Sequence, residues 1–332
     1  MLIVVLLAFG LPIQESLHYI YEGALGSPVA QARSLVRAAP LMLCAVGISI
    51  AWRSGAFNIG GEGQFVAGGL LAATSYVLFK SLPGGVLGPL LILVSALGGA
   101  LYAAFAGWLQ VRRGVLVVVS TILLNFIALQ ILNYAVSGPL KSGPLPLTER
   151  IPEAAMLLKF SNRTDFHVGV IAAIIVSVGM AFWMFGTSFG FRQRLVGESP
   201  ELARTLGMDA GRWQLGAMAL SGALCGLTAG IEYTALSGQV GVSFAQGIGF
   251  LAIPVALMGG LHPAGCIASG LVFGALFAGT ENLARYSTGG TSLIYIIQGI
   301  AVLSLLALGA VRKSRPNVAD APSPLTEGEA AA

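Results

Sequence analysis

Two long apolar runs of this chain are joined by GAFNIGGEGQ, residues 55–64. The run before it is Pro40–Trp52, and the run after it is Phe65–Phe79. Four glycines in these ten residues let the backbone bend and let neighbouring segments approach closely. A bilayer tolerates such irregular backbone only where protein or a watery cavity receives its N–H and C=O groups. We therefore expect a break between two membrane helices at this point.

The glycine-rich stretch also carries three polar side chains, those of Asn58, Glu62 and Gln64. Polar side chains at an interrupted pair of membrane helices are typical of a solute pathway. The alternative is a plain polar loop between two spans that happens to contain glycines, and the composition of the stretch does not decide between the two. Glu62 is the carboxylate that the break itself positions, so it is the strongest candidate of the three.

The composition of the whole chain places it in a membrane. Of its 332 residues 56% are hydrophobic and only 10% are charged, with a mean hydropathy of +0.84. A soluble domain carries about 25% charged residues. The 45 glycines predict close helix contacts, because small residues let membrane helices pack tightly. The net charge of +4 is interpreted as loop charge that sets topology, not as a nucleic-acid surface.

Apolar runs predict an all-α polytopic fold of about ten transmembrane helices with a broken-helix centre. The runs are Met1–Ile13, Pro40–Trp52, Phe65–Phe79, Val86–Gln110, Val115–Val136, His167–Thr187, Trp213–Tyr233, Gly247–Gly260, Ala264–Thr280 and Thr291–Val311. The first is short for a span of about 20 residues, so it either continues to Tyr21 or begins upstream. Residues 1–315 form the predicted transmembrane domain, and the polar residues 316–332 form a predicted disordered cytoplasmic tail.

Ten spans place both ends of the chain on one side of the membrane. Basic clusters abut span ends on that side, and they are Arg112-Arg113, Arg192 with Arg194, and Arg312-Lys313 with Arg315. Four of the opposing cations lie in the single long loop 138–166, which carries less weight. The clusters favour cytoplasmic N and C termini.

A short helix is predicted over Ser199–Gly207, in the basic loop between two runs. Its first residues suit a helix N-terminus, and glycine at its end suits a stop. The signal consists of Ser199, Pro200 and Glu201 at the start and Leu202, Ala203 and Leu206 on an apolar side. Such a helix fits a groove on a partner protein. The alternative is a helix that lies on lipid, since nearby arginines suit headgroups.

Small and polar residues recur at helical spacing inside the apolar runs. Glycines repeat every four residues at Gly222, Gly226 and Gly230, and again at Gly270 and Gly274, which predicts helix-contact faces. One turn separates Thr121 from Asn125 in the fifth run. These two side chains either line a polar pathway or make hydrogen bonds between helices.

Patterns that would indicate an enzyme are absent from the sequence. It contains no phosphate-binding Gly-x-x-x-x-Gly-Lys-Ser/Thr, no His-Glu-x-x-His and no Gly-x-Ser-x-Gly. The histidines lie far apart at run edges, so no metal site is predicted. The cysteines have no ligand or redox spacing and are predicted to be small core residues: Cys44, Cys225 and Cys266.

Several of these stretches together resemble a known family. They are FNIGGEGQ at 57–64, LNFIA at 124–128, VGESP at 196–200 with Ala203-Arg204 and Leu206-Gly207-Met208, SGALCGLTAG at 221–230, and GFLAIPVAL at 249–257 with His262-Pro263. They are similar to motifs of permease subunits of ATP-binding-cassette (ABC) importers for nucleosides and simple sugars, the ribose type. The resemblance runs in order from about Ala38 to Val311.

The resemblance implies a permease of roughly ten helices that works as a dimer of identical or different permeases. Two cytoplasmic ATPase subunits would bind ATP and Mg²⁺ and drive it, and an extracytoplasmic binding protein would deliver the solute. This chain would bind no cofactor itself and catalyse no reaction. Its membrane would be the bacterial inner membrane, and the form of the glycine-rich stretch leans toward nucleosides or purines over sugars.

The resemblance also implies roles for particular residues. The candidates for the substrate pathway are Asn58, Glu62, Gln64 and Asn125. The helix that couples to the ATPase would comprise Glu198, Ser199, Pro200, Glu201, Ala203, Arg204, Leu206 and Gly207. A stand-alone secondary carrier or facilitator is the alternative function. The sequence speaks weakly against it, because intramembrane charges are few and no inverted repeat is visible. A membrane-embedded enzyme is the third reading and lacks a catalytic constellation.

Overall fold

The computed structural model describes residues 12–161, 164–245 and 247–286, together with residues 296, 299–300 and 303–304. The α-helices are α2 (Ile13–Ala24), α3 (Pro28–Arg53), α4 (Gly61–Phe79), α5 (Gly84–Arg113), α6 (Val117–Ser137), α7 (Val168–Gly186), α8 (Ser188–Glu198), α9 (Pro200–Thr205), α10 (Ala210–Glu232), α11 (Ile248–Met258) and α12 (Pro263–Tyr286). Shorter elements are the 3₁₀ turns η1 (Glu153–Ala155) and η3 (Val242–Phe244), the π-helical turn η2 (Tyr233–Ser237), and the strands β1 (Lys159–Ser161) and β2 (Thr164–His167).

Long apolar helices dominate the described part of the chain, as predicted. Six of them are long and apolar enough to cross a membrane: α3, α5, α6, α7, α10 continued through η2, and α12. The chain is therefore an all-α polytopic membrane protein. The tenth predicted span, Thr291–Val311, lies outside the described residues apart from five positions, as do the first eleven residues and the predicted tail 316–332. The count of ten spans stays a prediction.

Two helices extend well beyond their predicted apolar runs. Helix α3 begins at Pro28, ahead of the run predicted from Pro40, and passes through Pro40. Helix α12 continues past Thr280, the end of the ninth predicted run, to Tyr286. The two extended helices pack against each other, and Arg37 and Glu281 form an ion pair between the extensions with N–O distance 2.8 Å. Both extensions therefore contain charged residues, which an apolar run excludes.

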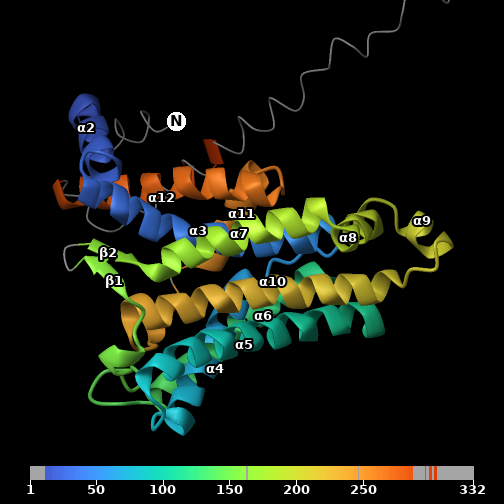
Figure 1. Cartoon of the computed structure of the whole chain (residues 1–332), viewed down its shortest axis with the longest axis horizontal. Coiled ribbons are helices and arrows are strands. Elements are labelled where there is room, and N and C mark those ends of the chain that lie inside the picture. Colours follow the sequence, from blue (N-terminus) through green and yellow to red (C-terminus); the bar gives the residue numbers. More distant parts are fainter. Residues whose placement is uncertain are drawn as a thin grey trace, which may run out of the picture.

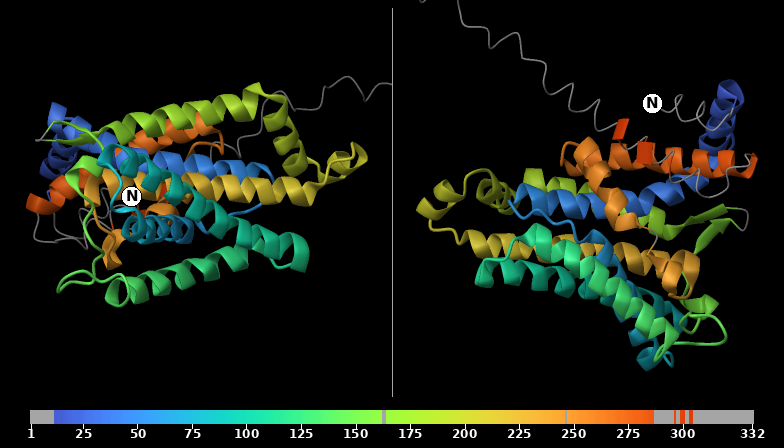
Figure 2. Two further views of the ribbon diagram at one scale, coloured as in Figure 1. Left: turned by 60° about the horizontal axis from the view of Figure 1, so that its bottom comes forward. Right: turned by 180° about the vertical axis from the view of Figure 1, so that it is seen from behind.

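The long helices lie side by side along one axis, which gives the molecule two ends (Figure 1). Helices α8 and α9 lie at one end, and the β1–β2 hairpin and η1 lie at the other. Figure 2 shows the same arrangement from two other directions. The hairpin pairs its strands antiparallel and occupies the segment that was predicted to be a long loop. We call these the α8–α9 end and the hairpin end.

Glycines allow a close contact between α5 and α10. A Cβ atom on Gly222 or Gly226 would overlap backbone atoms of Gly99 or Ser95 in α5. The hydroxyl of Ser95 donates to the carbonyl of Gly226 over 2.6 Å. In the same way Gly274 of α12 packs on α3. The predicted helix-contact faces are confirmed.

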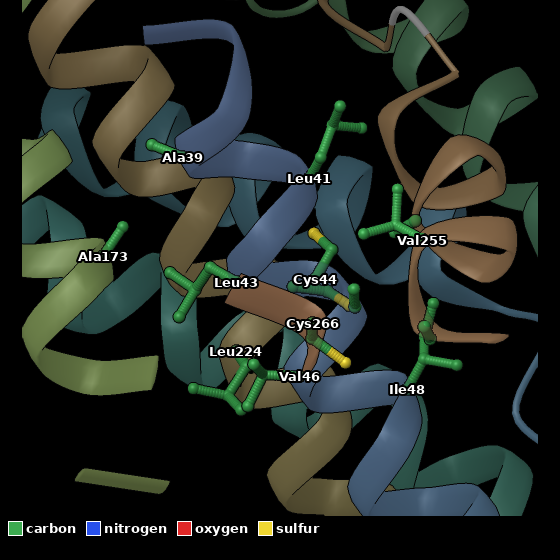
Figure 3. Close-up of a cluster of buried hydrophobic side chains, with 14 of the residues drawn as sticks. Ala39, Leu41, Leu43, Cys44, Val46, Ile48, Ala173, Leu224, Val255 and Cys266 are labelled. Carbon is green, nitrogen blue, oxygen red and sulfur yellow. The ribbon is translucent and has the colours of Figure 1, made fainter. Parts of the chain in front are cut away.

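The largest apolar core surrounds α3, which contacts α7, α10, α11 and α12. Its side chains come from all five helices and include the three cysteines. Each cysteine is fully buried and forms no disulfide. Figure 3 shows Cys44 and Cys266 among leucine and valine side chains of this core. The prediction that the cysteines are small core residues is confirmed.

One buried histidine at the hairpin end predicts a pH effect on stability. His167 ends β2 with its side chain 1% exposed, and neither ring nitrogen has a hydrogen-bond partner within the described structure. Burial, reinforced by Lys159, lowers its pKa from 6.5 to about 4. Between pH 6.5 and 4 the unfolded chain therefore takes up a proton that the folded chain does not, so stability falls as the pH falls through this window.

We expect the melting temperature of the detergent-solubilised protein to drop between pH 7 and pH 5, and to drop less in a His167→Asn variant. Thermal denaturation of both proteins at the two pH values measures this. Equal drops would show that His167 does not contribute to the pH dependence.

Candidate functional site

The glycine-rich stretch separates two helices in the structure. Helix α3 ends at Arg53 and α4 begins at Gly61, so residues 54–60 form the connection. Gly55 turns the chain with φ +80°, a conformation that favours glycine. The amide N–H groups of Gly55 and Ala56 donate to carbonyls in the last turn of α3. The connection is therefore an ordered turn, continuous with the end of α3.

Asn58 and Gln64 close this turn through their amide groups. Asn58 Nδ2 donates to Gln64 Oε1 over 3.0 Å, and Gln64 Nε2 donates to Asn58 Oδ1 over 2.9 Å. Asn58 Nδ2 also reaches Ser221 Oγ on α10 at 2.9 Å, and its Oδ1 accepts the N–H of Gly60 at 2.8 Å. The side chain of Asn58 thus joins the turn, α4 and α10 at one point.

Asn125 of α6 supports the same turn from another side. Its Oδ1 accepts the N–H of Gly63 over 2.8 Å, and its Nδ2 donates to the carbonyl of Ile59 over 3.0 Å. Thr121 Oγ1 accepts the N–H of Ile59 at 3.3 Å. In this structure Thr121 and Asn125 of α6 make hydrogen bonds to the turn and to the start of α4. Hydrogen bonding was one of the two interpretations of these side chains.

Glu62 joins the start of α4 to the start of α11. Its Oε1 accepts the N–H of Gly247 over 2.9 Å, and its Oε2 accepts the N–H of Gly249 over 2.7 Å. The side chain is 2% exposed. Position 249 requires glycine, because a Cβ there would overlap the backbone of Gly61 and Glu62. The two carboxylate oxygens of Glu62 therefore cap the N-terminus of α11, where the helix dipole favours negative charge.

The other end of α11 is held from the other side of the same turn. Arg53 Nε donates to the carbonyl of Leu261 over 2.6 Å, and its Nη2 donates to Gly260 over 3.2 Å. Arg53 and Glu62 flank residues 54–60 in sequence, so the two residues that bracket the turn contact the two ends of one short helix. A cation near the C-terminus of a helix and an acid at its N-terminus both match the helix dipole.

The structure brings all four predicted pathway residues together around this turn. Asn58, Glu62, Gln64 and Asn125 are each at most 2% exposed, and each bonds to protein atoms. Their role in a solute pathway stays a prediction. Within the described residues no group of three His, Cys, Asp or Glu side chains is placed to hold a metal ion.

The predicted short helix is present as α9, Pro200–Thr205, directly after α8, which was not predicted. Ser199 occupies the N-cap position, but its side chain makes no capping bond, because the residue also ends α8 and its backbone serves both helices. Gly207 stops α9 with φ +75°. Ala203 is buried, whereas Leu202 and Leu206 are 49% and 62% exposed. The apolar side of α9 is therefore open to a partner or to lipid.

Helix α8 connects α9 to the glycine-rich turn. Gln193 Nε2 donates to Ser54 Oγ over 2.8 Å. A Cβ on Gly197 would overlap the carbonyl of Arg53, so the two backbones are in direct contact. Arg53 and Arg194 also lie over the ring of Phe185, at 5.3 and 4.4 Å from its centroid. The α8–α9 arm, residues 188–205, is thus attached where α3 ends.

A histidine completes this contact at the end of α11. The ring of His262 stacks on Phe185 at a centroid distance of 4.0 Å. Burial, together with Arg53 and Arg194, lowers the pKa of His262 below its ordinary value. Nδ1 of His262 accepts the N–H of Ala264 over 3.1 Å, which requires that this nitrogen carries no proton, as in a neutral ring.

Sequence reasoning predicted no contact role for the residues that connect these parts. They are Arg53, Gln193, Ser221, Gly247 and Gly249. Their partners lie more than 100 residues away in sequence, so no local pattern could have found them. Arg53 carried one usable signal, since it is a charged residue immediately before the break.

A bundle of long apolar helices, with a buried polar turn between α3 and α4 and an arm at one end, identifies a polytopic membrane protein. The family model described as the permease component of the branched-chain amino acid transport system matches residues 31–306. The chain belongs to this family of ABC transporter permeases, which confirms the resemblance seen in the sequence and favours a permease subunit over a stand-alone carrier.

Curated relatives cover most of the chain. It is 32% identical over 314 residues to the glucose ABC transporter permease protein TsgB13 of Haloferax volcanii, covering 89% of this chain and 82% of that protein. It is 28% identical over 319 residues to the guanosine ABC transporter permease protein NupP of Bacillus subtilis, covering 93% and 90%. It is 29% identical over 292 residues to the nucleoside ABC transporter permease protein NupB of Lactococcus lactis, covering 84% and 80%.

Proposed function

We propose that this chain is the membrane subunit through which an ABC importer passes nucleosides, with simple sugars as the second candidate. A separate cytoplasmic ATPase binds ATP and Mg²⁺ and drives the cycle, and an extracytoplasmic binding protein delivers the solute. The permease works as a pair with a second copy or a paralogue. The observation that carries the proposal is the α8–α9 arm, which is exposed on one side and bonded to the glycine-rich turn on the other.

The α8–α9 end faces the cytoplasm in this proposal, with both chain termini on that side of the bacterial inner membrane. Basic residues support this orientation. Arg112 and Arg113 end α5 at this end, and Arg192 and Arg194 lie on α8. Clusters of cations beside span ends favour the cytoplasmic side. At the hairpin end, Lys80 and Lys159 are each paired with an acid.

The arm transmits the movement of the ATPase to the turn at the centre of the bundle. Leu202 and Leu206 fit a groove on the ATPase, and Glu198, Ser199, Pro200, Glu201 and Gly207 fix the shape of the arm around Ala203 and Arg204. Movement of α8 reaches Ser54 and Arg53 through direct contacts, and from there the turn and α11. In this proposal the turn and α11 together form the broken-helix centre of the ten-span permease.

The polar residues around the turn border the solute pathway in this proposal. Asn58, Gln64, Glu62 and Asn125 bond to protein in the described conformation, and these bonds fix the position of the turn. When the two permeases rock against each other, the turn and α11 shift together and the pathway opens to the other side.

Uptake of labelled guanosine tests the proposal. Source cells that lack this chain are expected to lose uptake, and so are cells that lack the partner ATPase, because the permease alone cannot drive import. Unlabelled ribose and glucose are included as competitors. Uptake that persists without the ATPase would establish a stand-alone carrier, and loss of glucose uptake with guanosine uptake intact would assign the sugar class.

A further inference from the structure

A polar pocket of about 570 Å³ opens at the hairpin end. Its lining residues come from α3, β2, α10 with η2, the segment 239–244, the start of α11 and α12, together with Leu147. The hairpin and the neighbouring ends of α3, α10 and α12 lie at this end of the bundle (Figure 1). Pockets that bind small molecules usually measure about 300–1,000 Å³ and combine apolar walls with a few polar groups. We call it the outer pocket.

Charged residues of both signs line the outer pocket, and one of them, Asp165, is paired with Lys159 outside the lining. Three arginines line it, and so do three acids. Two of these residues, Arg37 and Glu281, form the 2.8 Å ion pair between α3 and α12. A pocket that selects an ion carries an excess of the opposite charge. This one instead offers hydrogen-bond donors and acceptors, which suits an uncharged polar solute.

Apolar side chains also line the outer pocket. They include Phe244 and Ile248, together with Val36 and Leu236. The ring of Phe244 stacks on Phe65 of α4 with centroids 5.0 Å apart. Ile248 is the first residue of α11, between the two glycines that Glu62 holds. The pocket therefore reaches α4 and the start of α11, the two elements that Glu62 joins.

We propose that the outer pocket is the entry site of the permease, and that it takes an uncharged nucleoside whose base lies against the wall of Phe244 and Ile248. The polar edges of the base and the ribose meet Glu232 and Gln239, which lie on the pocket wall. This inference rests on the proposed function, since it assigns the pocket to the importer's own solute. A solute in the pocket touches Ile248, the first residue of α11. Its binding therefore affects the hydrogen bonds between Glu62 and the N-terminus of α11.

Cysteine labelling tests the pocket directly. The chain contains three cysteines, all fully buried, so a thiol introduced at Ser243 is readily distinguished from them. Intact source cells that carry the importer with Ser243→Cys are treated with a membrane-impermeant maleimide, with and without guanosine. At a guanosine concentration ten times its Kd we expect labelling to slow about tenfold, because only about a tenth of the sites stay free.

A matched control is Ser81→Cys, an exposed position after α4 at the same end but outside the pocket lining. Its thiol is expected to be labelled at the same rate with and without guanosine. Uptake of labelled guanosine by the same cells is measured in parallel. Protection at Ser243→Cys alone, in cells that import guanosine, is the expected result.

Other outcomes separate the two proposals. Cells that import guanosine but show no protection would overturn the pocket inference and leave the proposed function intact. Protection by glucose instead of guanosine would overturn the assigned solute class. Failure of the wild-type cells to import any nucleoside would overturn the proposed function itself. Failure of the impermeant reagent to label either thiol would overturn the inference, since the pocket would not open outward.

Discussion

Replacement of Glu62 by glutamine is expected to reduce uptake by about tenfold or more, since a shift of 1.4 kcal/mol changes an equilibrium constant tenfold. The carboxylate accepts two N–H groups of the α11 N-terminus. Glutamine keeps one acceptor oxygen and turns an NH₂ group toward the other N–H. A lost hydrogen bond to a charged group costs about 1.5–3 kcal/mol. The contact between Glu62 at the start of α4 and the N-terminus of α11 therefore weakens, while the fold is retained.

Uptake per copy of the protein in the membrane measures this effect, alongside the melting temperature in detergent. Glu62→Asp keeps both oxygens on a shorter side chain and should recover part of the uptake. Glu153→Gln, on the exposed turn η1, makes the same chemical change without a buried partner and should leave uptake unchanged. Normal uptake by Glu62→Gln at normal abundance would refute the role of this contact.

The sequence indicated the class of fold because membrane residence leaves a strong local pattern. Apolar runs and glycine spacing predicted the positions of α5, α6, α7 and α10 to within a few residues. Helix ends were less predictable where a helix extends past its apolar run into charged residues, as α3 does at Arg37 and α12 does at Glu281. These two residues form an ion pair across more than 200 residues of sequence, which no local pattern contains.

The candidate site was predictable in its centre but not in its contacts. Glycines and polar side chains marked Asn58, Glu62 and Gln64, and the structure does bring them together. The role of Glu62 as a cap of α11 was not visible, because Gly247 and Gly249 look like ordinary glycines of an apolar run. Arg53 and Glu62 flank this turn and contact the two ends of α11. This arrangement depends on the length of α11, which only the fold defines.

The same reasoning gives the second large effect, at the α8–α9 arm. The double variant Arg204→Glu with Leu206→Asp is expected to abolish uptake while abundance and melting temperature stay unchanged. Both side chains are exposed, and surface substitutions usually change stability by no more than about 0.5 kcal/mol. The change places two negative charges on the face that we assign to the ATPase groove, so docking is lost.

Co-purification of the ATPase with the permease separates docking from a direct effect on transport. The double variant should fail to retain the ATPase, whereas Lys141→Glu, an exposed charge reversal in the loop after α6 at the hairpin end, should retain it and import normally. If α9 instead lies on lipid, the ATPase will co-purify with the double variant and uptake will persist. The two readings of this short helix differ in which molecule covers Leu202 and Leu206, and this pair of measurements tells them apart because only a docked ATPase turns a surface change into a complete loss of import.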